Sequence, residues 1–150
     1  MAIEEILRSL PMFNTLTDKE KKKLTEKNLT PVRFKKGETV IREGETCQAL
    51  FALLKGTVLV TKAQDDAQIR LAKLGAGEIF GEMSFFSRGP RKSNVVANDD
   101  VVALKMDQQF FDALDGGIRD KVKNYFIELL IRRLDSMNES IMKISKLMRS

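Results

Sequence analysis

The residues most able to do chemistry lie in one short stretch, Phe80 to Ser93, which reads FGEMSFFSRGPRKS. Gly81 lets the backbone turn tightly and brings a main-chain N–H close to a ligand, because no Cβ stands in the way. Glu82 follows at once and supplies an acceptor for a hydroxyl group. Arg91 follows the stiff residue Pro90, and its guanidinium fork fits two oxygens of one phosphate. A carboxylate for hydroxyls and an arginine for a phosphate together indicate a pocket for a sugar phosphate.

The stretch resembles the phosphate-binding cassette of cyclic nucleotide-binding domains, in which F-G-E-aliphatic-small is followed by a short loop and P-R-x-small-x-V. The resemblance implies that Glu82 binds the ribose 2′-hydroxyl. It also implies that Arg91 and the amides around Gly81, Met83 and Ser84 bind the cyclic phosphate, with the amides at the start of a short helical turn. The alternative is a strand–turn–strand segment with a solvated Glu82 and Arg91. The full pattern, with nine residues between the glycine and the arginine, favours the cassette.

Length and composition predict one soluble globular domain: the chain has 150 residues, of which 43% are hydrophobic and 31% charged. The apolar runs are too short for a transmembrane helix. The acidic segment Met1–Glu5 lacks the features of a secretory leader, so we expect a cytoplasmic protein. With the single cysteine Cys47 and no histidine, neither an internal disulfide nor a metal site is expected. We interpret Cys47 as structural.

The absence of histidine also removes the usual general base, and no nucleophile-elbow, zinc-protease or Walker motif is present. The sequence therefore predicts a protein that is not an enzyme and has no cofactor. Residues 118–150 hold 8 basic and 4 acidic side chains, so most of the net charge of +5 lies there. This excess could attract an acidic partner, but ordinary solvation of a helix explains it as well.

The order of elements predicts a mainly β fold with flanking helices, in a single domain over residues 1–150. Residues 1–28 favour two short helices, one from Ile3 that ends before Pro11 and one that is capped by Thr17. Residues 29–105 favour short strands separated by glycines and aspartates, which is typical of a sandwich or jelly roll. The expected strands are 30–34, 38–42, 49–54, 57–62, 68–73, 78–80, 93–97 and 101–105. The glycine order also resembles the cyclic nucleotide-binding jelly roll, an eight-stranded barrel that carries the cassette at 80–93.

Residues 106–150 favour a short helix over Met106–Leu114, a glycine pair, and a long helix over 118–149. Gly116-Gly117 is expected to cap the short helix and to act as a hinge. An a/d repeat in the long helix predicts that a second copy of the chain packs against it, giving a homodimer. Its members are Leu130, Leu134, Met137, Ile141, Ile144 and Met148.

The segment Ile131–Leu134, which reads IRRL, resembles the long helix of the catabolite-activator-like branch, which dimerises and closes over the purine. The resemblance implies that Arg133 and Asn138 face the ligand, although Met137 and Asn138 stand where that branch has hydroxyl residues. No helix-turn-helix follows before Ser150. The chain is therefore expected to be a single-domain binder or a piece of something longer, with no DNA binding of its own and no membrane contact.

The leading hypothesis is a regulatory domain that binds a cyclic nucleotide, cAMP in preference to cGMP, and moves its C-terminal helix in response. The expected ligand-binding residues are Val60, Leu71, Phe80, Gly81, Glu82, Met83, Ser84, Arg91, Lys92, Ser93, Arg133 and Asn138. A second hypothesis is a degenerate jelly roll that serves as a dimerisation or scaffold module, and Lys92 and Asn94 favour it because the family has a small or hydroxyl residue after the arginine. A third, a DNA-binding regulator, would need a further domain or the basic tail.

Overall fold

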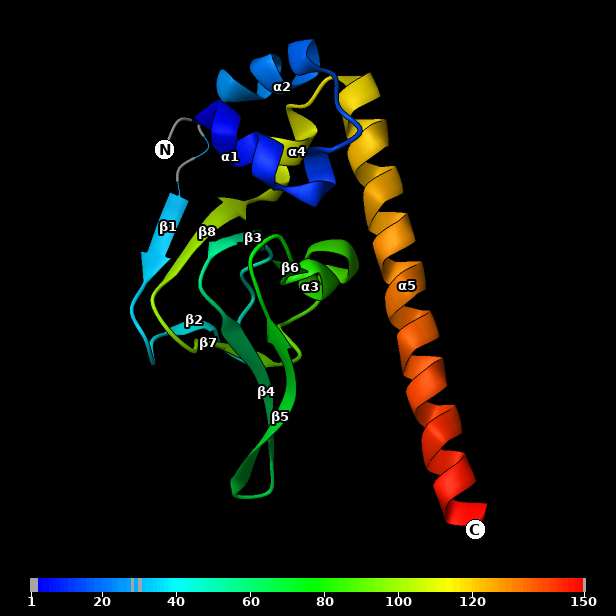
Figure 1. Ribbon diagram of the computed structural model, residues 1–150. Coiled ribbons are helices and arrows are strands. Elements are labelled where there is room, and N and C mark those ends of the chain that lie inside the picture. The colour runs from blue at the N-terminus through cyan, green and yellow to red at the C-terminus, as the bar shows by residue number, and fades with distance from the viewer. Residues whose placement is uncertain (1–2, 28, 30, 150) are drawn as a thin grey trace. The chain divides into compact units, whose positions relative to one another are not determined.

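The computed structural model describes residues 3–27, 29 and 31–149, and within them the strands form two antiparallel four-stranded sheets (Figure 1). The first sheet has the strand order β1-β8-β3-β6 and the second β2-β7-β4-β5. The strands are β1 (Pro31–Phe34), β2 (Thr39–Ile41), β3 (Leu50–Lys55), β4 (Val58–Gln64), β5 (Ala67–Leu74), β6 (Ile79–Phe80), β7 (Asn94–Ala97) and β8 (Val101–Met106).

All eight expected strands are confirmed, with bounds that differ by at most two residues where the structure describes them. Thr30, where the first expected strand begins, lies outside the described residues. The expected mainly β fold with flanking helices is confirmed, but the expected eight-stranded barrel does not close, because the strands form two separate four-stranded sheets. Each sheet has its own edge strands, and β5 lies at an edge of the second sheet.

The core lies between the two sheets, where inward-facing apolar side chains from both meet. The β3 run LFAL is buried throughout, as expected of a strand flanked by β8 and β6. Phe51 of β3 stacks on Phe80 of β6 with ring centroids 5.1 Å apart. Val58 of β4 and Val95 of β7 complete this cluster from the second sheet. The contact between Phe51 and Phe80 therefore packs the first residue of the cassette into the core.

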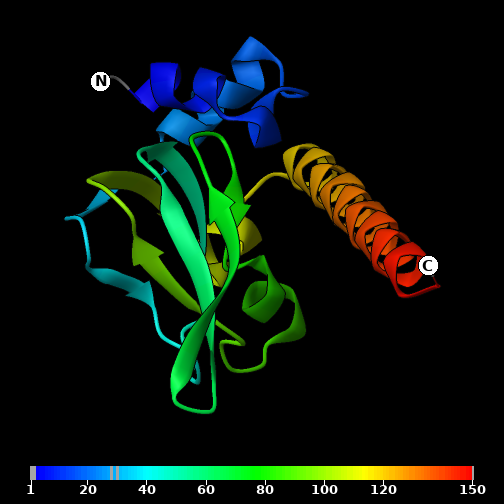
Figure 2. The same cartoon turned by 60° about the horizontal axis from the view of Figure 1, so that its bottom comes forward.

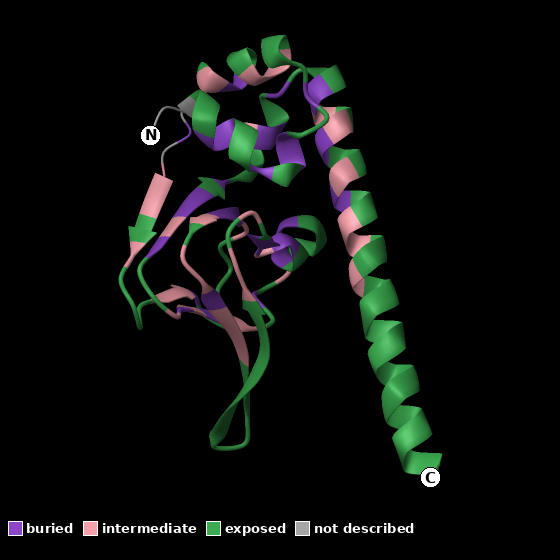
Figure 3. Cartoon of the chain, viewed as in Figure 1, coloured by how far each residue is buried: buried purple, intermediate pink, exposed green. Residues whose placement is uncertain are grey.

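The hairpin of β4 and β5 extends well beyond the other strands as a long twisted ribbon (Figures 1 and 2). Its outer half is exposed on both strands (Figure 3). Asp65 in the turn has a φ of 53°, a left-handed conformation that aspartate tolerates in tight hairpin turns. The register shifts between Val60 and Thr61, so that Val60 pairs with Ala72 and Leu71 lies at the irregularity.

The N-terminal helices are α1 (Ile3–Ser9), the 3-10 helix η1 (Pro11–Phe13) and α2 (Asp18–Thr25), and they lie at one end of the sheets (Figure 1). The predicted capping box of α2 is confirmed: the Glu20 N–H donates to Thr17 Oγ1 at 3.1 Å, and the Thr17 N–H donates to Glu20 Oε1 at 2.9 Å. Leu7, Phe13 and Leu24 are among the buried apolar side chains of this region.

The last two helices are α4 (Gln108–Asp112) and α5 (Gly116–Arg149), and the chain divides between them into two compact units, Met1–Leu114 and Asp115–Ser150. The expectation that Gly116-Gly117 caps the preceding helix is wrong. Ala113 caps α4 in a right-handed conformation, and the Arg119 N–H already donates to the Asp115 carbonyl. The glycine pair therefore forms the first turn of α5. Among the described residues, no helix is both long and apolar enough to span a membrane.

Candidate functional site

The cassette begins with a tight turn at Gly81 between β6 and the short helix α3 (Glu82–Ser87). Gly81 has a φ of 82°, in the left-handed region that glycine adopts without strain. A Cβ at this position would lie 3.0 Å from Arg91 Nη1 and 3.1 Å from the carbonyl oxygen of Ala49. Both the backbone conformation and the crowding therefore require glycine here.

Arg91 is buried, and its guanidinium lies against the turn at Gly81. Its Nη1 donates to the Gly81 carbonyl at 2.9 Å, and its Nη2 donates to the Ala49 carbonyl at 2.5 Å. Only 5% of the residue is exposed. Both acceptors are main-chain carbonyls, which orient the guanidinium without cancelling its charge. A guanidinium has five N–H donors, so these two hydrogen bonds use only part of its donor capacity.

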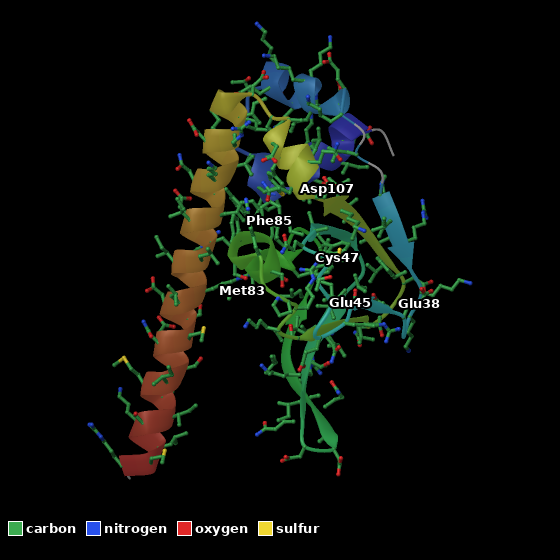
Figure 4. The ribbon with its side chains drawn as sticks, turned by 180° about the vertical axis from the view of Figure 1, so that it is seen from behind. Glu38, Glu45, Cys47, Met83, Phe85 and Asp107 are labelled. Carbon is green, nitrogen blue, oxygen red and sulfur yellow. The ribbon has the colours of Figure 1, made fainter. Side chains whose placement is uncertain are left out.

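Glu82 and Ser84 in the first turn of α3 are also buried, at 7% and 2% exposure. A carboxylate and a guanidinium thus lie in the same small region of the fold, next to the first N–H groups of a helix, which have no intrahelical acceptors. Met83 is exposed, whereas Phe85 is buried on the same helix (Figure 4). The arrangement suits a ligand with both hydroxyl and anionic groups.

The other residues predicted for the site occupy different environments. Phe80 is packed in the core against Phe51, Val60 is partly buried beside the core, and Leu71 is 56% exposed on the hairpin. Lys92 is exposed and Ser93 half-buried, directly after Arg91.

Arg133 and Asn138 lie on α5, in the second compact unit. Their contact with a ligand therefore stays a prediction.

Sequence reasoning missed the segment Glu43–Ala49, which supplies a carbonyl to Arg91 and further hydrogen bonds to the cassette. Figure 4 shows Glu45 and Cys47 on this segment. The local signal was Gly44, which separates two expected strands and belongs to the glycine order that resembles the family's jelly roll; its φ is 89°.

The sequence profile of one family, described as the cyclic nucleotide-binding domain, matches residues 31–115, more than half of the chain. The chain belongs to this family. The predicted resemblance is thereby confirmed, and the matched span contains both sheets and the whole cassette.

Two curated relatives of this cyclic nucleotide-binding domain are regulators. The cAMP-dependent protein kinase type II regulatory subunit of Drosophila melanogaster is 32% identical over 142 residues, which cover 94% of the chain and 35% of the relative. The CRP-like cAMP-activated global transcriptional regulator of Mycobacterium tuberculosis is 33% identical over 142 residues, which cover 93% of the chain and 62% of the relative. The chain thus spans about a third and about three fifths of the lengths of these two proteins.

Solved structures share the fold. The Thermus thermophilus catabolite activator protein superposes with a TM-score of 0.78 at 27% identity, covering 90% of this chain and 63% of that one. A cyclic nucleotide-binding domain from Methylobacillus flagellatus gives a TM-score of 0.81 over 94% of this chain and 81% of that one, at 24% identity. The second likeness concerns the fold alone.

Proposed function

We propose that this domain binds a cyclic nucleotide as a regulatory sensor and performs no chemistry on it. The observation that carries the proposal is the buried, preoriented guanidinium of Arg91 beside the turn at Gly81 and the buried carboxylate of Glu82. The two hydrogen bonds of this buried cation go to neutral main-chain carbonyls, and a buried cation favours an anion as a further partner. The phosphate of a cyclic nucleotide supplies this anion, and its ribose supplies a hydroxyl for Glu82.

The preferred ligand in this proposal is cAMP, with cGMP second. The names of both curated relatives refer to cAMP. The cassette itself addresses only the sugar phosphate, which the two nucleotides share. Discrimination between adenine and guanine therefore rests on residues outside the cassette, for which Leu71 on the hairpin and Asn138 on α5 are the candidates.

We further propose that α5 carries the response and joins two copies of the chain. Its predicted seam contains Leu134, Met137, Ile141, Ile144 and Met148, all between 57% and 82% exposed. Burying such side chains stabilises an assembly by roughly 1.5–3 kcal/mol for each one that is fully covered. The a/d spacing matches a second identical helix, so a homodimer is the proposed assembly.

Calorimetric titration of the purified chain with cAMP and with cGMP tests the proposal. Saturable binding of one ligand per chain, tighter for cAMP, is the expected result. AMP serves as the control, because it carries the same base and sugar without the cyclic phosphate. If neither cyclic nucleotide binds, the chain is the degenerate jelly roll of the second hypothesis, and sedimentation then decides whether it still dimerises.

A further inference from the structure

The segment Glu43–Ala49, which connects β2 to β3, is hydrogen-bonded to the part of the cassette that carries Arg91. The Gly44 N–H donates to the Arg91 carbonyl at 2.9 Å, and the Arg91 N–H donates to the Glu45 carbonyl at 2.8 Å. This reciprocal pair bonds both the N–H and the carbonyl of Arg91 to one segment. It depends on the left-handed conformation of Gly44, whose φ is 89°.

The same segment also holds side chains of the cassette strand. Ala49 accepts a hydrogen bond from the Arg91 guanidinium, as described above. The Glu43 N–H donates at 2.8 Å to the Oδ1 atom of Asn94, which lies three residues after Arg91 in the sequence. The main chain of Arg91, its guanidinium and the side chain of Asn94 at the start of β7 are thus all hydrogen-bonded to this one segment. The bonded residues lie more than 40 residues apart in the sequence.

Gln48 extends this contact to the turn that precedes Arg91. Its Nε2 donates to the Arg88 carbonyl at 2.7 Å. Arg88 ends α3 with φ 58° and ψ 18°, a left-handed conformation that is unfavourable for an L-residue other than glycine, asparagine or aspartate. The hydrogen bond from Gln48 therefore stabilises a strained peptide unit. Only Gly89 and Pro90 separate this unit from Arg91, and Pro90 has a fixed φ, so the unit lies close in the chain to the residue that carries the guanidinium.

We propose that Glu43–Ala49 is a template that holds Arg91 in its anion-binding position, and that Gln48 is the positioning residue of this template. The identity of the anion, a cyclic phosphate, rests on the proposed function, whereas the template concerns the chain alone. Gln48 acts through Arg88 and does not touch the ligand. Loss of its hydrogen bond lowers the fraction of molecules whose cassette can bind the ligand. The apparent affinity falls in proportion to this fraction.

The first test compares Gln48→Ala with the matched control Gln64→Ala, an exposed glutamine at the end of β4. A fluorescent cAMP analogue is mixed with each protein in a stopped-flow instrument, at a temperature where all variants are folded. We expect the affinity of Gln48→Ala to fall about tenfold, on the scale of one hydrogen bond to a strained unit. The loss should lie in the association rate, with the dissociation rate and the control unchanged. A change in the dissociation rate alone would place Gln48 in contact with the ligand and overturn the proposal.

The second test needs no ligand. Amide hydrogen exchange measured by NMR should be faster at Gly44 and Arg91 in Gln48→Ala than in the wild type. The Leu53 amide, which donates to the Glu78 carbonyl at 2.9 Å outside the template, is the internal reference and should not change. Unchanged exchange at Arg91 overturns the template, and faster exchange with an unchanged association rate removes Gln48 from binding. If exchange rises but the wild type binds neither cyclic nucleotide, the proposed function fails and the template stands.

Discussion

The buried guanidinium of Arg91 is oriented by two carbonyl oxygens that would lose their partner in any shorter side chain. Arg91→Ala should therefore weaken both ligand binding and the fold. We expect about 2–5 kcal/mol of lost cAMP binding, the usual range for truncating one member of a buried charge pair. The carbonyls left without donors should lower the free energy of unfolding by about 1–3 kcal/mol.

Calorimetry and urea unfolding measure these two losses separately. Arg33→Ala, at an exposed arginine on β1, is the matched control and should change neither. Arg91→Lys keeps the charge but cannot bridge both carbonyls and the phosphate, so its affinity should lie between those of the wild type and the alanine variant. An unchanged dissociation constant in Arg91→Ala would remove this residue from the site.

Glu82 is proposed to bind the ribose 2′-hydroxyl, and an isosteric change tests this assignment. Glu82→Gln should weaken cAMP binding by about 1.5–3 kcal/mol, the range for hydrogen bonds to charged groups. Binding of 2′-deoxy-cAMP should change much less, because the partner hydroxyl is missing. The two proteins and two ligands form a cycle whose coupling energy is the measured quantity. Purely additive losses would mean that Glu82 is structural.

Lys92 is exposed directly after Arg91, and we predict that it adds a second positive charge near the phosphate. Lys92→Ser should then bind cAMP more weakly, and its affinity should depend less on ionic strength, since an exposed charge is screened by salt. Titrations at low and high salt give the slope. Equal affinities and equal slopes in the two proteins would show that Lys92 points into solvent.

At the scale of elements, local patterns were enough to predict the helices and strands. The capping box at Thr17 and the glycine-separated strands depend on neighbours within a few residues, and these expectations are confirmed. The prediction that the glycine pair at 116–117 caps a helix was wrong, because it also used only local propensity. In the structure α5 begins at this pair. The contacts of Glu43–Ala49 with the cassette could not be predicted, because no local pattern reports hydrogen bonds between segments so far apart in the sequence.

Aromatic side chains of helices α3 and α4 are in contact. This contact connects the cassette with the last helix of the first unit. Phe85 of α3 and Phe111 of α4 are both buried, with ring centroids 4.8 Å apart. The variants Phe85→Leu and Phe111→Leu, alone and together, form a double-mutant cycle. We expect a coupling energy in urea unfolding of about 0.5–1.5 kcal/mol, typical of an aromatic pair.

The same cycle on cAMP affinity shows whether this contact transmits ligand binding as well as stabilising the fold. A nonzero coupling in affinity would mean that the cassette and α4 move together. Coupling in stability without coupling in affinity would leave the pair as core packing only.

At the scale of the whole molecule, dimerisation and ligand binding are coupled if α5 takes part in both. Leu134→Glu places a charge within the predicted seam and should weaken the dimer by at least roughly 1.5–3 kcal/mol, the contribution of one fully buried side chain. Ser136→Glu adds the same charge at a position outside the a/d seam, on another face of the helix, and should leave the dimer intact. Sedimentation equilibrium measures both. A Leu134→Glu protein that stays fully dimeric would move the interface away from α5.

Thermodynamic linkage then separates a helix that only joins two chains from one that also responds to the ligand. If cAMP changes the dimer dissociation constant by some factor, dimerisation must change cAMP affinity by the same factor for the pair of sites. The wild-type affinity should therefore depend on protein concentration across the range where the dimer forms, and Leu134→Glu should abolish this dependence. Truncation after Leu129 should give a monomer that still binds the sugar phosphate, but more weakly and with little preference between cAMP and cGMP. A wild-type dimer whose cAMP affinity is the same at every protein concentration would show that α5 holds the assembly together without carrying the signal.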